Sequence, residues 1–294
     1  MSATSERIRE EWAASDARRD AGLVTPEDVE RFDSIPYGKD PKWNLLDVYR
    51  PRGKAEILPV IVSVHGGGWV YGDKELYQFY CMSLAQRGFA VVNFSYRLAP
   101  ESKFPAPLED TNRVIGWMYK NQEKYRLDMN HVFLVGDSAG GHLAGLYAAI
   151  CTNPEYAAEY SFQVPCGFVP QALGLNCGVY APLGTEAMQE QETLEDFLPE
   201  NVSDREKRLL QVPDYVTPGY PPVYLMTCVG DFCRPQAPLL EKALKKNGVP
   251  YELAVYGDEK NPLYHVFHVT VQEPEGQRCN DAECAFFRRV MRQS

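Results

Sequence analysis

The sequence lacks the features that mark a membrane-embedded protein or a nucleic-acid-binding protein. None of its apolar runs approaches the roughly 20 residues that a membrane-spanning helix needs. Its net charge of −10 argues against nucleic acid or an anionic membrane surface as a partner, because phosphate groups repel an acidic protein. Internal repeats and low-complexity segments are absent as well. These absences are consistent with a globular protein and, apart from the two partners they argue against, say little about what it binds.

The sequence also lacks a C-x-x-C motif, although it contains eight cysteines. The first residues, Ser2 to Arg7, are polar and charged, unlike a secretory signal. We therefore expect reduced thiols in a cytoplasmic protein and not a disulfide framework. A length of 294 residues, with 45% hydrophobic residues, is enough for one large α/β domain with a cap or for two small domains.

The chain is organised around one stretch, HVFLVGDSAGG at residues 131–141. An apolar run ends at Gly136, Ser138 follows between small residues, and a helix of small side chains begins. In this G-x-S-x-G pattern a tight turn holds the serine in sparsely populated backbone geometry, and Gly136 and Gly140 leave the room that the turn needs. The pattern predicts that Ser138 is a nucleophile at the carboxyl edge of a sheet.

Strand-like and helix-like segments alternate along most of the chain. Apolar runs predict strands at 45–49, 59–64, 89–94, 131–135, 172–179, 222–229 and 251–256. Helices are predicted at 74–87, 107–125, 139–151, 235–247 and 281–291. Such alternation is typical of an α/β fold with a mostly parallel sheet, helices on both faces and a site beyond the carboxyl ends of the strands.

Two segments interrupt this alternation. The first, residues 1–34, is charge-rich and helical, with a further helix start expected at Thr25 to Asp28. This segment is either a frayed tail or part of a lid. The second, residues 181–220, is acidic and too long for a plain connection between two strands, so we predict that it forms an inserted cap. The alternative is a helix that fills an ordinary crossover. The expected division is an N-terminal cap or lid segment (1–34), a first core part (35–180), an inserted small helical cap (181–220) and a second core part (221–294).

A glycine-rich loop follows the strand expected at 59–64, where His65 precedes three consecutive glycines. Glycines in this position can bring backbone N–H groups close to a substrate oxygen, which acyl transfer needs for the charge of its tetrahedral intermediate. We expect Gly67 and Gly68, with Ala139 after the serine, to form this oxyanion hole. We expect His65 to hold the loop through its ring hydrogen bonds. The alternative interpretation is a flexible surface loop.

A general base and its orienting acid should follow the serine, each after a later strand. Asp231 comes directly after the strand expected at 222–229, and His265 lies shortly after the last expected strand. Ser138 is a poor nucleophile until His265 takes its proton, and Asp231 would fix the ring tautomer and stabilise the imidazolium. The sequence therefore predicts a catalytic triad of Ser138, Asp231 and His265.

Other titratable residues compete for these roles. His268 lies three residues beyond His265, so sequence order does not exclude it as the base. Asp258 could replace Asp231, although it precedes the histidine within one loop. Further residues nearby are expected to be structural or buried: His131, His142, Asp137, Cys228 and Cys233.

Aromatic residues follow the triple glycine. We interpret Trp69 and Tyr71 as substrate-binding residues which, with Tyr77 and Tyr80, would narrow the pocket toward short acyl chains such as acetyl or butyryl. The same four side chains could equally be part of the core.

Five motifs occur together, namely HGGGW at 65–69, YRLAPE at 96–101, FPAP at 104–107 before Glu109-Asp110, GDSAGG at 136–141 and HVF at 265–267. In combination they resemble the hormone-sensitive-lipase-like (bacterial family IV) esterases over residues 45 to 270. The resemblance implies an α/β-hydrolase fold, a serine carboxylester hydrolase, a cap built from the N-terminus and a late insertion, and no metal or organic cofactor. The chain departs from that family after Asp231, where Phe232-Cys233-Arg234 stand in place of proline and leucine.

We therefore predict a serine esterase that forms an acyl-enzyme at Ser138 on short-chain acyl esters, with acetyl esters of sugars or small metabolites among the candidates. Its expected partner is a small-molecule ester, without nucleic acid or a membrane span, and a homo-oligomer is left open. Two alternatives keep the fold. One is a non-catalytic ligand-binding protein, which the complete triad disfavours, and the other is an amidase or peptidase that uses the same residues.

Overall fold

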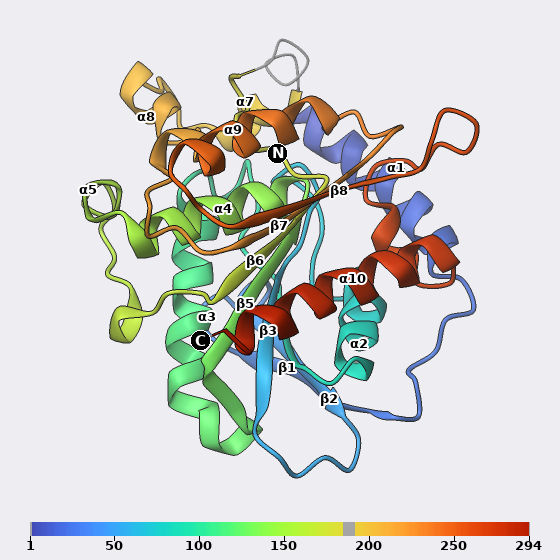
Figure 1. Cartoon of the computed structure of the whole chain (residues 1–294). Helices are drawn as coiled ribbons and strands as arrows, with labels where there is room; N and C mark the ends of the chain where they lie inside the picture. Colours follow the sequence, from blue (N-terminus) through green and yellow to red (C-terminus); the bar gives the residue numbers. More distant parts are fainter. Residues whose placement is uncertain (1, 185–191, 294) are drawn as a thin grey trace.

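An eight-stranded sheet forms the centre of the molecule in the computed structural model, which describes residues 2–184 and 192–293 (Figure 1). The strands lie in the order β1-β2-β4-β3-β5-β6-β7-β8. The β1–β2 and β2–β4 pairs are antiparallel, and the pairs from β4 across to β8 are parallel. The strand bounds are β1 (Val29–Pro36), β2 (Leu45–Pro51), β3 (Leu58–Val64), β4 (Ala90–Phe94), β5 (Leu127–Asp137), β6 (Ala172–Asn176), β7 (Val223–Cys228) and β8 (Tyr251–Tyr256).

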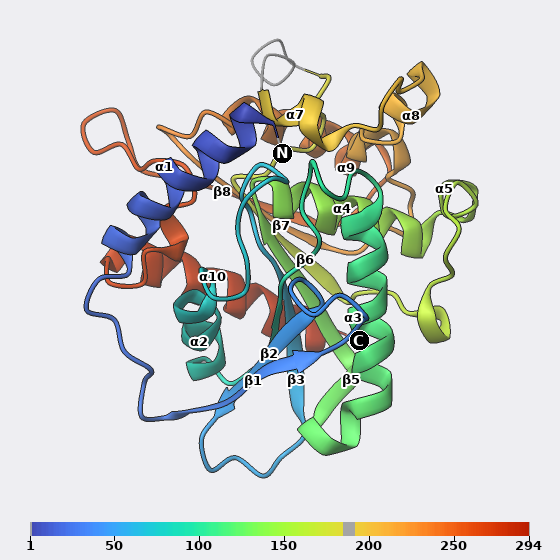
Figure 2. The same cartoon turned by 180° about the vertical axis from the view of Figure 1, so that it is seen from behind.

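Helices cover both faces of this sheet (Figures 1 and 2). One face packs against α2 and α10, and the other packs against α3, α4 and α9. The prediction of an α/β fold with a mostly parallel, doubly covered sheet is therefore confirmed. The bounds of these helices are α2 (Gln78–Gln86), α3 (Ala106–Tyr125), α4 (Ala139–Thr152), α9 (Ala237–Lys246) and α10 (Pro274–Met291), and the short α5 (Pro154–Ala157) follows α4.

Strand β3 illustrates why the central strands are apolar at almost every position. Val60 and Val62 belong to the core formed with α3, α4 and α9, whereas Ile61 between them belongs to the core formed with α2 and α10. Successive side chains of a strand point to opposite faces, so a strand covered on both faces needs apolar residues throughout. Burial of these runs holds the carboxyl ends of β3, β5, β6 and β7 side by side at one edge of the sheet.

Helices from two distant segments lie above that edge (Figures 1 and 2). The hydroxyls of Ser2 and Ser5 donate to the carboxylate of Asp196, and Arg7 pairs with Glu192 at 2.8 Å. The N-terminal helix is thus docked on the later segment, and its assignment as a cap or lid stays a prediction. The helices are α1 (Ala3–Arg19), α7 (Glu192–Phe197) and α8 (Asp204–Arg208), which precede the 3-10 turn Val212–Tyr215.

Between β6 and β7, the expected inserted cap thus contains short helices, while its residues 185–191 lie outside the described part of the chain. None of the described helices is long and apolar enough to cross a membrane.

Some predicted element boundaries are wrong. The helix expected to start at Thr25 is replaced by β1, because Val29 is buried against α2 and its strand pairs with β2, which outweighs the local start signal. The sheet therefore begins before residue 35, where the sequence analysis started the core. Helix α2 begins four residues later than expected, since Lys74 forms a buried ion pair with Asp47 at 3.0 Å. Helix α10 begins at Pro274 and not at 281.

Candidate active site

Ser138 lies at the sharp turn between β5 and α4, as the G-x-S-x-G pattern predicts. Its backbone angles are φ 52° and ψ −121°, which side-chain-bearing residues rarely adopt. A Cβ on Gly136 would lie 2.4 Å from the carbonyl oxygen of Gly140, and one on Gly140 would lie 2.0 Å from that of Val64. Glycine is therefore required at both positions. The N–H of Ser138 donates to the carbonyl of Asn176 at 3.1 Å, which fixes the turn to β6.

Asp231 and His265 meet after the neighbouring strands β7 and β8. The Nδ1 of His265 donates to Oδ1 of Asp231 at 2.6 Å, while the hydroxyl of Thr227 donates to Oδ2 at 2.9 Å. Burial is the largest single effect on Asp231 and raises its pKa, but the hydrogen bond and the charge of His265, together with the N–H of Cys233 and the hydroxyl of Thr227, outweigh burial and lower the pKa below its usual value. The carboxylate therefore stays ionised and fixes which ring nitrogen of His265 carries the proton.

A pocket with a volume of about 370 Å³ brings the separated motifs together. Ser138 and His265 both line it, together with Gly67 and Gly68, while Asp231 is buried behind the imidazole. The side chain of His265 is 21% exposed, so its ring can be reached from the pocket. Residues that the sequence analysis did not assign to the site also line it, namely Trp12, Ser15, Asp16, Arg19, Leu76, Phe232 and Val266.

The glycine-rich loop forms a tight turn beside Ser138. Gly67 has φ +111° and Gly68 has φ +57°, and a Cβ on Gly67 would lie 2.0 Å from the carbonyl oxygen of Tyr71. Within the described residues, no acceptor is found for the N–H groups of Gly67 and Gly68. Ala139, at the first position of α4, adds an N–H that has no partner within its own helix. The three residues expected to form an oxyanion hole are therefore gathered around Ser138.

His65 holds this loop, as the sequence predicts. Its Nδ1 donates to the carbonyl of Gly66 at 2.7 Å, and its ring stacks on Tyr96 with centroids 3.9 Å apart. Burial lowers the pKa of His65 to about 4, so the ring is neutral. A second support escaped the sequence analysis. The hydroxyl of Tyr77 accepts from the N–H of Gly66 at 2.9 Å and donates to Asp137 at 2.7 Å.

This link gives Asp137 a structural role, because burial raises the pKa of its carboxyl to about 6 and the hydrogen bond from Tyr77 offsets part of that cost. In the sequence, the only signal for the link between Tyr77 and Asp137 is the aspartate that precedes the serine in the G-D-S motif.

The competing base and acid are not at the pocket. His268 is fully buried, packs edge-on against Tyr80 at 5.2 Å, and has its pKa lowered to about 3 by burial. Asp258 accepts the N–H groups of Lys260 and Asn261 within its own loop, at 2.8 Å each. His265 lines the pocket and is hydrogen-bonded to Asp231, whereas His268 is buried away from the pocket and Asp258 bonds within its own loop, so His265 and Asp231 are the pair that the geometry favours.

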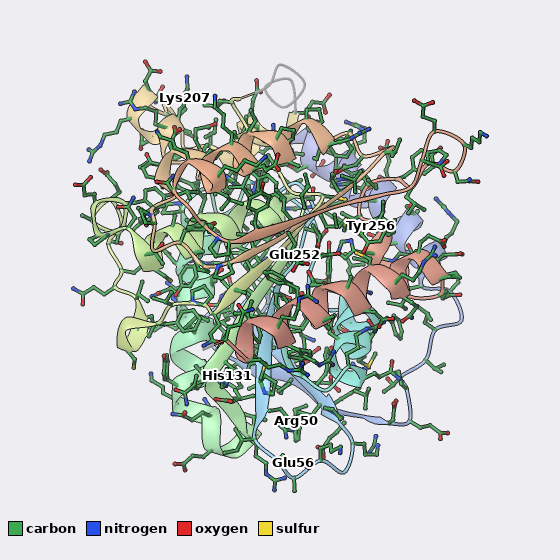
Figure 3. The ribbon with its side chains drawn as sticks, in the orientation of Figure 1. Arg50, Glu56, His131, Lys207, Glu252 and Tyr256 are labelled. Carbon is green, nitrogen blue, oxygen red and sulfur yellow. The ribbon has the colours of Figure 1, made fainter. Side chains whose placement is uncertain are left out.

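The remaining two histidines are structural, as expected. His142 is buried, with Nε2 donating to the carbonyl of Leu210 at 2.8 Å and Nδ1 accepting from the indole of Trp69 at 3.2 Å. His131 pairs with Asp128 at 2.7 Å on β5, toward the end of the molecule opposite to α1 and α7 (Figure 3).

The aromatic residues divide between pocket and core. Tyr71 lines the pocket, and its hydroxyl donates to Asp16 at 2.8 Å. Trp69, by contrast, is 2% exposed, stacks on Phe197 at 4.8 Å and does not line the pocket. The interpretation of Trp69 as a substrate-binding residue is therefore replaced by the core alternative, because its indole joins the loop to α4 and α7. Phe232 instead faces the pocket, with its ring 4.2 Å from that of His265.

Several known esterases are similar to this chain in sequence. The chain is 36% identical over 127 residues to the esterase LipC of Mycobacterium tuberculosis. The aligned region covers 42% of this chain but only 31% of LipC. It is 29% identical over 248 residues to the versiconal hemiacetal acetate esterase of Dothistroma septosporum, which covers 78% of the chain and 73% of that esterase. The expected resemblance to esterases of the hormone-sensitive-lipase-like family is thereby confirmed.

Solved structures show the same fold over nearly the full chain. Esterase B from Lactobacillus rhamnosis, inhibited by a C4-C4 tributyrin phosphonate, superposes with a TM-score of 0.91 at 29% identity and covers 99% of this chain and 95% of its own. A bacterial heroin esterase superposes with a TM-score of 0.76 at 24% identity and supports the fold alone. The chain thus has the α/β-hydrolase fold of these esterases. More narrowly, residues 46–231 match the BD-FAE family model, and the chain belongs to that family.

Proposed function

We propose that this protein is a serine carboxylester hydrolase that acts through an acyl-enzyme at Ser138. The observation that carries the proposal is the pocket that joins Ser138 and His265 to the unpartnered N–H groups of Gly67 and Gly68, with Asp231 hydrogen-bonded behind the imidazole. Each part of an acyl-transfer mechanism then has a residue in reach of one site.

In the proposed mechanism, His265 accepts the proton of the Ser138 hydroxyl as the oxygen attacks the ester carbonyl. Asp231, already ionised, stabilises the imidazolium that forms. The N–H groups of Gly67, Gly68 and Ala139 stabilise the negative oxygen of the tetrahedral intermediate. His265 returns the proton to the leaving alcohol and then activates a water molecule, which releases the acid from the acyl-enzyme.

We further propose that the substrates carry short acyl chains, with acetyl esters of sugars or small metabolites among the candidates. A pocket of about 370 Å³ has room for a small ester, and its lining includes residues of α1 and the ring of Phe232. The inhibitor named for the Lactobacillus esterase carries C4 chains, which agrees with this size. We place the enzyme in the cytoplasm, and its eight cysteines, all of them free thiols, support a reducing compartment.

The decisive experiment compares the wild type with Ser138→Ala on p-nitrophenyl acetate. Loss of the nucleophile is expected to lower kcat at least about 10³-fold, and a fluorophosphonate should add its mass to the wild type alone. A matched control is Ser83→Ala, since Ser83 is buried on α2 and only donates to the carbonyl of Tyr80. Unchanged turnover in Ser138→Ala would remove the serine mechanism. A series of acyl lengths and a matched ester and amide pair then test the substrate class.

A further inference from the structure

A thiol lies beside the charged pair behind Ser138. The Sγ of Cys177, a carboxylate oxygen of Asp231 and a ring nitrogen of His265 all lie within 4.8 Å of one another. Among the described residues, no other group of three or more His, Cys, Asp and Glu side chains converges in this way. The acyl-transfer mechanism uses Asp231 and His265 but gives no role to Cys177.

The fold fixes all three groups from adjacent strands. Cys177 directly follows β6, has φ +47°, and donates its N–H to the carbonyl of Met226 on β7 at 2.7 Å. Asp231 follows β7, and His265 follows β8. Cys177 and Asp231 are buried, while the imidazole is the part that can be reached from the pocket. An ion that enters the pocket therefore meets the imidazole first and the other two donors behind it.

These donors match the preference of soft divalent cations. A thiolate, an imidazole and a carboxylate form a three-ligand set of the kind that holds Zn²⁺ with one open position. With bond lengths of about 2.0–2.3 Å, tetrahedral ligand atoms lie roughly 3–4 Å apart. Shifts of about 1 Å would therefore close the present arrangement around an ion. A fourth position facing the pocket would be filled by water.

We propose that Cys177, Asp231 and His265 form a site for a soft divalent cation such as Zn²⁺ or Cd²⁺, and that its occupancy switches off hydrolysis. The ion takes the place of the Nδ1 proton between His265 and Asp231, and that proton moves to Nε2. Cys177 binds as the thiolate and releases its proton to water, so one proton leaves for each ion bound. With Nε2 protonated and Nδ1 bound, the ring can no longer accept a proton from Ser138.

Cys177 supplies the ligand that a catalytic triad does not provide by itself. An aspartate and a histidine occur in every triad of this kind, and two ligands alone hold a cation weakly. The Sγ of Cys177 donates to the Sδ of Met226 at 3.9 Å, and metal binding would replace this contact. The thiol of Cys228 donates to the carbonyl of Tyr264 at 3.2 Å and does not belong to the convergent group. The inhibition rests on the proposed function, whereas the binding of the ion does not.

Binding is tested by titrating Cd²⁺ into the metal-free Ser138→Ala protein and recording the ultraviolet absorption of the cadmium–thiolate bond. We expect the band to saturate at one equivalent of Cd²⁺. It should be lost in the double variant that combines Ser138→Ala with Cys177→Ala and kept in the one that combines Ser138→Ala with Cys166→Ser. Cys166 is the matched control because its thiol is exposed. A band of unchanged size in the Cys177 variant overturns the site. This readout is independent of turnover, so it stands even if Ser138→Ala proves as active as the wild type.

Inhibition is tested with Zn²⁺ on p-nitrophenyl acetate, each variant being normalised to its own rate after chelation. The zinc concentration for half inhibition should rise at least about tenfold in Cys177→Ala and in Cys177→Ser, and EDTA should restore the wild type. Two variants are used so that one with poor folding does not decide the test, and thermal melting checks both. Equal zinc sensitivity of the wild type and the folded Cys177 variant would overturn the proposal.

Discussion

The two walls of the pocket are built in different ways. On the sheet side, Ser138 and the glycine-rich loop are fixed by backbone packing so close that no Cβ fits at Gly67 or Gly140. On the cap side, α1 buries only Ser5 and Ile8 among its described residues. Apart from an edge-on contact of Trp12 with Tyr71, the rest of its attachment that the structure shows is largely polar. The catalytic groups are therefore held by closely packed backbone, whereas the pocket is covered by a helix with few buried residues.

The polar contacts of α1 show how the cap side is held. Arg9 donates to the carbonyl of Val70 at 2.7 Å and pairs with Glu101, also at 2.7 Å. Arg19 donates to the carbonyl of Leu76 at 3.0 Å, which joins the end of α1 to the segment after the glycine-rich loop. Contacts of this kind are partly exposed and individually contribute little. We expect substitutions on the sheet side to change kcat and those on the cap side to change KM.

The largest expected effect separates the two histidines of the sheet side. His265→Ala should lower kcat/KM at least about 10³-fold, because Ser138 loses its base. His268→Leu should leave kcat/KM within about threefold, since His268 is buried away from the pocket and neither of its ring nitrogens has a partner in the described residues. Steady-state kinetics on p-nitrophenyl acetate would decide between them. If His268→Leu were the inactive variant, the assignment of the base would be wrong.

The next effect tests the packing of the loop itself. Gly67→Ala should lower kcat about 100-fold, because the new Cβ would collide with the carbonyl of Tyr71 and displace an oxyanion donor. Gly53→Ala is the matched control, since Gly53 also has a positive φ, +76°, but nothing lies within 4 Å of its Cβ position. That control should lose about 1 kcal/mol of stability and keep its activity. Equal loss of activity in both variants would show that backbone strain alone is responsible.

The same contrast explains what the sequence could and could not predict. The strands, the order of Ser138, Asp231 and His265 and the glycine loop are encoded in short, continuous patterns, because each depends on its own strand and turn. The burial of Trp69 and the replacement of a helix start by β1 depend on partners far along the chain. Trp69 is buried by Phe197, and β1 is fixed by its pairing with β2.

The residues of α1 that line the pocket escaped the sequence analysis for the same reason, although a lid in that segment was one of its two alternatives. Trp12 and Asp16 stand on a charge-rich helix whose place over the pocket is decided by contacts with α7 and with the loop that carries Tyr71. Periodicity within α1 shows which side chains share a face but not what that face meets. Phe232 was visible as a departure after Asp231, yet only the structure shows its ring on His265.

A smaller effect is expected on the cap side. Trp12 is 38% exposed, packs edge-on against Tyr71 at 5.8 Å and lines the pocket. Trp12→Ala should raise KM about three- to tenfold with kcat within about twofold, because the residue contacts bound ester without contacting the reacting atoms. Ile57→Ala, an exposed apolar residue outside the pocket, serves as the control. A large fall in kcat with unchanged KM would mean that α1 positions the catalytic groups as well.

The smallest effect concerns a buried acid beneath the sheet side. Glu283 accepts from Asn176 at 2.8 Å and from Tyr80 at 3.2 Å, and burial raises the pKa of its carboxyl to about 7. The folded protein therefore keeps a proton that the unfolded chain releases above its ordinary pKa of 4.5. Stability from this group is complete at low pH and is lost as pH rises through about 7.

Glu283→Gln keeps the shape and the acceptor for Asn176 but removes the titration. The Tm of the variant relative to the wild type should therefore be higher at pH 8 than at pH 5, by a few degrees. Differential scanning fluorimetry at the two pH values measures this, with the exposed Glu123→Gln as the control. A difference in Tm that is the same at both pH values would show that Glu283 is already ionised in the fold. The sheet side would then hold a buried carboxylate. The hydrogen bonds from Asn176 and Tyr80 would compensate for the loss of its hydration.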